Sequence, residues 1–136
     1  MRKKTRAQIG IEYMIIVSFV TFSVMVIFAL AIFYSGQTKD QIRLNQIENF
    51  AVQVVNSAES VFFAGEPSKT TITLSLPDGV SNIQVVSDGI IFRVSTSSGE
   101  NTRLFESTVP LSGSIDINEG TKEITLTATD EYVIID

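Results

Sequence analysis

Residues 13–33, YMIIVSFVTFSVMVIFALAIF, are apolar almost throughout and decide how this chain can fold. No charged residue occurs between positions 13 and 38. About 20 apolar residues in a helix cross a hydrocarbon layer about 30 Å thick, so the stretch is long enough to span a membrane. It therefore predicts a hydrophobic helix near the N-terminus.

A cluster of positive charge precedes this stretch. Arg2, Lys3, Lys4 and Arg6 are four of the ten basic residues of the chain. Basic residues beside a membrane helix tend to stay in the cytoplasm, so the expected orientation is N-terminus in and C-terminus out. Without residues 1–7, the chain has six basic and fifteen acidic side chains, a balance of −9. This argues against nucleic-acid binding, which depends on clustered Lys and Arg.

The composition excludes several kinds of catalytic and metal site. The chain has no Cys and no His, which removes thiol nucleophiles, imidazole bases and Cys/His zinc sites. Residues 116–120, DINEG, resemble the start of a calcium loop, but the bidentate acid that ends such a loop is missing at the required spacing. We therefore expect no enzyme activity, no cofactor and no metal.

A second helical pattern follows the apolar stretch. Thr38 and Gln41 have the spacing of a capping box, which would restart a helix after a break near Gly36. Beyond them, apolar residues recur at spacings of mostly three and four, as in an amphipathic helix with one buried face. Gly65 and Pro67 are then expected to end the helix. The apolar stripe consists of Ile42, Ile47, Phe50, Ala51, Val54, Val55, Ala58, Val61 and Phe62.

The sequence period changes from helical to two after Lys69. Ile72, Leu74 and Leu76 alternate with Thr and Ser, which predicts a half-buried strand. Asp88-Gly89, between two β-rich runs, is the clearest hairpin signal, because both residues tolerate positive φ angles. Closely spaced turn signals predict an antiparallel β-sandwich or small barrel. These signals are PDG (77–79), SDG (87–89), SSGEN (97–101), PLSG (110–113), NEG (118–120) and TDE (129–131).

The β region is small for a core without disulfides and needs a further apolar surface. The apolar stripe of the second helical segment can supply it. We therefore expect an α+β protein in which a long N-terminal hydrophobic helix packs, as the stalk of a lollipop, on a small antiparallel β-sandwich or barrel head. The expected parts are a cleavable basic leader (1–7), a transmembrane or filament-core helix (8–38), an amphipathic helix half (39–66) and the β head domain (67–136).

The N-terminal segment has four interpretations: a plain single-pass anchor, a secretory signal cut after ALA at 29–31, an interfacial amphipathic helix, and an assembly helix later buried among its copies. Apolar residues surround the helix, which excludes the interfacial form. Glu12 favours the assembly helix, because a carboxylate in hydrocarbon costs roughly 2.5 to 3.5 kcal/mol at mid-helix and a plain anchor gains nothing from it. A position of Glu12 at the membrane surface is the simple alternative.

Residues 3–19, KKTRAQIGIEYMIIVSF, resemble the class III signal sequence of archaeal type IV pilin-like proteins. In that family a basic stretch and a small residue precede a Gln, and a Glu is the fifth residue after the cut. Ala7 and Gln8 match the cleavage point, and Glu12 matches the fifth position. The family favours Ser two residues after the Gln and Leu further along, where this chain has Gly10 and Ile16.

The resemblance implies cleavage between Ala7 and Gln8 by a membrane prepilin peptidase on the cytoplasmic side. The retained helices would bundle as the core of a helical adhesion pilus on the cell surface, built by an assembly ATPase and a platform membrane protein. Glu12 would pair with the new amino group of Gln8 and set the register, because an unpaired buried charge is costly. The expected filament-core residues are Ile9, Ile11, Tyr13, Met14, Ile15, Ile16, Val17, Phe19, Val20, Phe22, Val24, Val26, Ile27, Phe28, Leu30, Ile32 and Phe33.

A function from another class is also open. The same segments are consistent with a secreted or single-pass membrane-anchored β-domain that binds a ligand or an envelope partner as a monomer. The two functions differ in where the mature chain begins and in whether copies associate.

Overall fold

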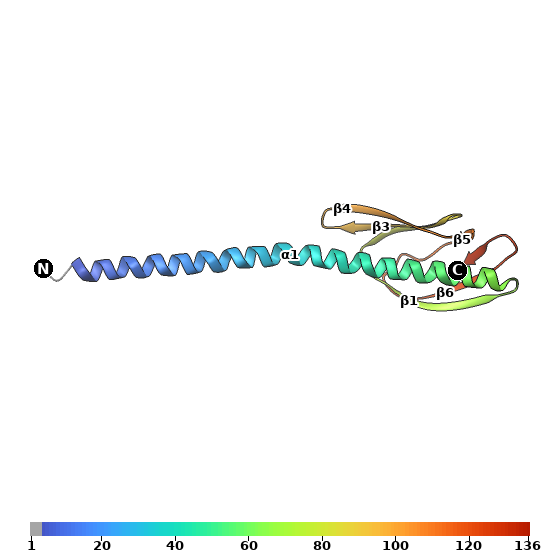
Figure 1. Ribbon diagram of the computed structural model, residues 1–136, viewed down its shortest axis with the longest axis horizontal. Helices are drawn as coiled ribbons and strands as arrows, with labels where there is room; N and C mark the ends of the chain where they lie inside the picture. The colour runs from blue at the N-terminus through green and yellow to red at the C-terminus, as the bar shows by residue number, and fades with distance from the viewer. Residues whose placement is uncertain (1–3) are drawn as a thin grey trace. The chain divides into compact units, whose positions relative to one another are not determined.

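The computed structural model describes residues 4–136, with side chains from residue 10 onward. Helix α1 comes first and the strands follow it (Figure 1). The chain divides into two compact units, Met1–Thr38 and Lys39–Asp136, which are described separately. The elements are α1 (Lys4–Ala64), β1 (Lys69–Leu76), β2 (Val80–Val86), β3 (Gly89–Thr96), β4 (Gly99–Glu106), β5 (Leu111–Gly113), β6 (Gly120–Ala128) and β7 (Val133–Ile135).

The strands of the second unit form two sheets. One has the order β1-β6-β7-β5 and the other the order β2-β3-β4. The expected α+β class, with a helix packed on a small β head, is confirmed. The barrel alternative is wrong, because the two sheets are separate. The head is also not purely antiparallel, since β5 runs parallel to β7, with Leu111 opposite Val133.

The PLSG segment, expected to be a turn, contains strand β5 instead. Leu111 is buried in the core together with Val109 and Ile115, so this short segment is held by its apolar side chains. Gly113 allows the close approach of β7, because a Cβ atom there would lie 2.0 Å from the carbonyl oxygen of Ile135. Burial and close backbone packing therefore override the local turn signal.

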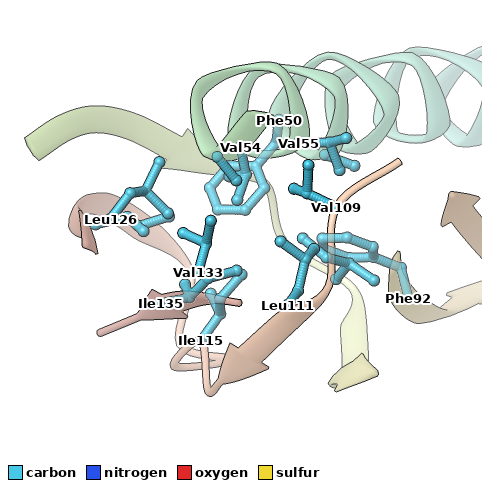
Figure 2. Close-up of a cluster of buried hydrophobic side chains, with 14 of the residues drawn as sticks. Phe50, Val54, Val55, Phe92, Val109, Leu111, Ile115, Leu126, Val133 and Ile135 are labelled. Atoms are coloured by element: carbon cyan, nitrogen blue, oxygen red, sulfur yellow. The ribbon is translucent and has the colours of Figure 1, made fainter. Parts of the chain in front are cut away.

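The apolar stripe of the second helical segment packs on the sheets, as expected. Figure 2 shows Phe50, Val54 and Val55 of α1 among core side chains that include Phe92 and Leu126. The rings of Phe50 and Phe92 meet edge to face, with their centroids 6.0 Å apart. The other buried members of the stripe are Ile47, Ala51, Ala58 and Val61, and Phe62 is partly buried.

Ile42 is the exception to this stripe, because its side chain is 52% exposed. It lies five residues before the buried Ile47, which corresponds to about 140° around a helix of 3.6 residues per turn. Its assignment to the buried face was therefore wrong.

Both predicted boundaries of the second helical segment can be compared with the backbone. Thr38 is not a helix cap, because α1 is helical on both sides of it and its hydroxyl donates to the carbonyl oxygen of Tyr34 at 3.1 Å. The break expected near Gly36 is likewise absent from the helical backbone. The predicted C-terminal end is confirmed: α1 ends at Ala64, and Gly65 follows with a φ of +78°.

The hairpin predicted at Asp88-Gly89 exists, but with a different loop. Val86 pairs with Gly89, so Ser87 and Asp88 are the two loop residues. Gly89 begins β3 with a φ of +152°. A Cβ atom at Gly89 would lie 2.1 Å from the carbonyl oxygen of Phe105. The glycine is therefore needed for close contact with β4 instead of for the turn itself.

Candidate functional site

The main candidate site is the apolar surface of α1 in the first unit. Between Ile11 and Tyr34, every large apolar side chain is exposed, from 41% at Val26 to 74% at Ile32. By length and composition, this part of α1 is apolar enough to cross a membrane. A continuous apolar surface of this size is not found exposed on soluble monomers, so lipid or protein must cover it.

Ser23, a polar residue within this surface, needs no hydrogen-bond partner from outside the helix. The hydroxyl of Ser23 donates to the carbonyl oxygen of Phe19, one turn earlier, at 2.8 Å. Such a bond satisfies the hydroxyl within the helix itself. Glu12 differs, because it is the only acidic residue before Asp40 and its side chain is exposed near the start of the apolar surface.

The predicted filament-core residues from Ile11 to Phe33 all lie on this one helix. Ala7, Gln8 and Ile9 lie outside the residues whose side chains the structure describes. The processing site and the pairing of Glu12 with the Gln8 amino group therefore stay predictions.

Two carboxylates of α1 in the second unit bind turns of the head. Asp40 accepts hydrogen bonds from the hydroxyl of Ser97 and from its backbone N–H, the latter at 2.9 Å. These bonds, the hydroxyl first, lower the pKa of Asp40. Glu59 accepts from the backbone N–H of Thr108 at 3.0 Å and from its hydroxyl at 2.8 Å, which lowers the pKa of Glu59. Each carboxylate therefore fastens a loop to the helix.

Arg43 adds an ion pair at the same end of the unit as Asp40. Its Nη2 atom lies 2.6 Å from Oδ2 of Asp78, and its Nε atom lies 3.2 Å from Oδ1. Hydrogen bonding between the two raises the pKa of Arg43 and lowers that of Asp78. Sequence reasoning missed this pair, because nothing local connects an arginine of the helix with a turn 35 positions later.

The surface grooves of the second unit are open to solvent. A groove of about 280 Å³ is lined by Gln46, Asn49, Gln53 and residues of the β1 end. Its polar lining consists of these amides, which form hydrogen bonds, and of the hydroxyl group of Ser75. Among the described residues, no group of three or more acidic side chains is placed to hold a metal ion.

Sequence reasoning also missed a second row of residues on α1, on the side away from the core. Ile42, Val52 and Phe63 are exposed there, by 52%, 43% and 74%. Their spacing was hidden by the denser pattern of buried residues on the opposite side. A search for a second helical period among the residues left over from the first could have found it.

Comparisons with known protein families, with curated proteins and with solved structures found no match to this chain.

Proposed function

We propose that this chain is a type IV pilin-like filament subunit, made as a prepilin, cleaved before Gln8 and polymerised through the apolar surface of α1. One observation carries the proposal: an apolar surface of membrane-spanning length surrounds α1 in the first unit, while the second unit has its own buried core. Such a surface can be covered by lipid before assembly and by other copies afterwards. The protein acts by assembly and display on the cell surface, for adhesion, and not as an enzyme.

Burial alone does not drive this assembly. Covering apolar surface is worth about 25 cal/mol per Å² relative to water, but lipid already covers the helix before assembly. Moving the helix from lipid into a filament therefore changes the free energy little. This supports a need for energy from an assembly ATPase, transmitted through a platform membrane protein.

Removal of the leader changes the charge at the start of the helix. Residues 1–7 contain Arg2, Lys3, Lys4 and Arg6, which hold the N-terminus on the cytoplasmic face. Cleavage deletes these charges and creates an amino group four residues before Glu12, which is about one helical turn. Pairing with that group, in the same or an adjoining copy, offsets the cost of placing Glu12 among apolar helices.

The intact mass of the mature protein tests the processing step. A chain that starts at Gln8 is the expected result. A start at Ile32 would identify a secretory signal, and an uncut chain would identify a membrane anchor, so either outcome contradicts the proposal. Electron microscopy of sheared cell-surface material then tests for filaments.

The role of Glu12 is tested by the isosteric Glu12→Gln variant. We expect loss of filaments, because the neutral amide cannot form the ion pair that sets the register. Glu119→Gln, an exposed head position, is the matched control and should assemble normally. The intact mass also reports whether Gln8 has cyclised and lost its charge. Normal filament yield from Glu12→Gln with an uncyclised Gln8 would rule out the ionic role.

A further inference from the structure

The two sheets of the second unit each end in a long strand that has no partner strand on its outer side within residues 4–136. β1 is outermost in the sheet β1-β6-β7-β5, and β4 is outermost in the sheet β2-β3-β4. Each has eight residues, contains no Pro and pairs with its neighbour without a register shift. The other two outermost strands are less regular, because β5 has only three residues and β2 has a register shift between Val80 and Asn82. Long, regular edges such as those of β1 and β4 are ready to take another strand.

The outer edge of β1 presents the backbone groups of its odd-numbered residues. The N–H of Ala128 donates to the carbonyl oxygen of Ser68, its opposite residue, so these two form a hydrogen-bonded pair. In an antiparallel ladder, hydrogen-bonded pairs alternate with pairs that are not bonded to each other. The even-numbered residues of β1 therefore bond to β6. The backbone N–H and C=O groups of Thr71, Thr73 and Ser75 point outward from the sheet edge, and their side chains are exposed.

The outer edge of β4 presents backbone groups in the same way. The N–H of Ser107 donates to the carbonyl oxygen of Asp88, so by the same alternation the odd-numbered residues of β4 bond to β3. The backbone groups of Glu100, Thr102 and Leu104 therefore point outward from the edge, and their side chains are exposed. Leu104 is 50% exposed although it is apolar. This edge thus carries donors, acceptors and an apolar side chain that the single chain does not cover.

β1 and β4 run in opposite directions along α1. β1 runs from the residues after the end of α1 back to the turn in which Asp78 binds Arg43. β4 runs the other way, towards Thr108, which binds Glu59 nearer the end of α1. Two copies that point the same way therefore bring β4 of one copy beside β1 of the other in antiparallel orientation.

The two edges are complementary when the strands overlap in full. The outward-pointing backbone groups of both strands then meet, and the exposed side chains lie on one face. β1 contains one Lys and no acid, whereas β4 contains two Glu and one Arg, so β4 fits β1 better than it fits another β4. Opposite charges and Thr–Thr pairs across two strands stabilise a sheet. The facing pairs are Lys69 with Glu106, Thr71 with Leu104, Thr73 with Thr102, and Ser75 with Glu100.

We infer that the outer edge of β4 on one copy pairs with the outer edge of β1 on the next copy in the filament. This inference rests on the proposed function and names a contact between its β-domains. Because two different edges meet, the contact is heterologous, and every copy uses both of its long edges. Two strands alone are marginally stable in water, so the pairing depends on α1 to hold the β-domains at high effective concentration.

Cysteine cross-linking tests the pairing and its direction, because the chain has no native Cys. Ser75→Cys and Glu100→Cys are made singly and together, and intact sheared filaments are oxidised. The double variant should form a ladder of disulfide-linked multimers, because each copy then links to two neighbours. Each single variant should stay monomeric, because a heterologous contact does not bring two copies of the same residue together.

The double variant Ser75→Cys with Leu104→Cys is the matched control. Leu104 lies four residues along the strand from Glu100, which is about 13 Å and too far for a disulfide with Ser75. The control should therefore form multimers at least about tenfold less than the double variant with Glu100→Cys. If the strands were parallel with Thr73 opposite Thr102, the control would cross-link instead.

Several outcomes overturn the inference. One is a double variant with Glu100→Cys that stays monomeric in intact filaments, and another is a ladder of equal strength from the control. Dimers from either single variant would show that identical edges meet. Wild-type chains that form no filaments would refute the proposed function, and this inference with it, whereas filaments without the ladder refute the inference alone.

Hydrogen exchange provides a second measurement that needs no substitution. The N–H groups of Thr71 and Thr73 point outward from β1, so they should exchange quickly in the detergent-solubilised chain. In filaments they should exchange at least about tenfold more slowly, because the next copy then accepts their hydrogen bonds. The N–H of Ile72 is the matched control, since it bonds to β6 in both states and should change little. Exchange of Thr71 and Thr73 at the same rate in both states would show that the edge stays open.

Discussion

Gly89 is the residue at which backbone geometry most restricts the sequence. Its φ is +152°, and a Cβ atom would lie 2.1 Å from the carbonyl oxygen of Phe105. Gly99 has a φ of +121° but no atom within 4 Å of the same position. We expect Gly89→Ala to lower the free energy of unfolding by about 3 kcal/mol or more, and Gly99→Ala by about 1 kcal/mol. Thermal unfolding of the detergent-solubilised chain measures both, and equal losses would contradict the steric argument.

Asp116 gives the head a predictable dependence on pH. The Nζ atom of Lys122 lies 2.5 Å from its carboxylate, and the side-chain amide of Asn118 donates to it at 2.9 Å. The hydrogen bond from Lys122, followed by those from Asn118, lowers the pKa of Asp116 from 3.8 to about 2. Because the folded-state pKa is the lower one, the stabilisation is present above pH 3.8 and is lost as the pH falls towards about 2.

The measurement compares melting temperatures of the wild type and Asp116→Asn across this range. At neutral pH the variant should melt at a lower temperature, and the difference should shrink between pH 3.8 and about 2. A difference that stays constant with pH would assign the effect of the substitution to packing and not to the charge.

At this scale the sequence predicted the hairpin but not its register. Asp88-Gly89 marked a turn correctly, yet the pairing of Val86 with Gly89 puts the glycine in the strand. The close contact between Gly89 and Phe105 is made by β4, more than ten residues further along. Local turn preferences carry no information about such a neighbour.

Among the elements, the part of α1 in the second unit has one side buried in the core and one side exposed. Phe50 is 2% exposed and contacts Phe92, whereas Val52 is 43% exposed on the side of α1 away from the core. We expect Phe50→Ala to cost about 3 to 5 kcal/mol of stability, because it leaves a cavity between helix and sheet. Val52→Ala should change stability by less than about 0.5 kcal/mol.

Urea unfolding followed by circular dichroism, on the detergent-solubilised chain, measures this pair. Val52→Ala should leave the unfolding midpoint nearly unchanged, because its side chain lies outside the core. A large loss of stability from Val52→Ala would show that this side of α1 also contributes to the fold of the single chain.

Periodicity predicted these elements where one pattern dominated and failed where two overlapped. The buried stripe of α1 is dense, so its helix and its packing on the sheets were readable from spacing alone. Ile42 belongs to the other side of the same helix and was assigned to the first pattern because it was apolar. Strand β5 was missed because three residues beside β7 are too few to show a period.

For the whole molecule, the apolar surface of the first unit was predictable because it depends only on composition and length. The contacts that hold the head to its helix were not. Arg43 meets Asp78, and Glu59 meets Thr108, across long separations in sequence that no local pattern connects. Composition and length therefore indicate the apolar surface, while the contacts between the helix and the head follow only from the fold.

The separation of roles between the two units leads to a prediction about a truncated chain. Every buried apolar residue of the core lies between Ile47 and Ile135, within the unit Lys39–Asp136. The exposed apolar side chains from Ile11 to Tyr34 lie in the other unit. We therefore expect residues 39–136, expressed alone, to be soluble without detergent and to unfold cooperatively, because their core does not need the apolar surface.

The truncated chain should also stay monomeric at micromolar concentration, because it lacks the continuous apolar surface from Ile11 to Tyr34. Sedimentation measures its mass, and circular dichroism during heating measures its cooperativity. The Phe50→Ala substitution in the truncated chain is the matched control and should abolish the cooperative transition or move it to a much lower temperature. An unfolded truncated chain would show that the core of the second unit does depend on the first unit. A truncated chain that polymerises by itself would show that the first unit is not the part that controls assembly.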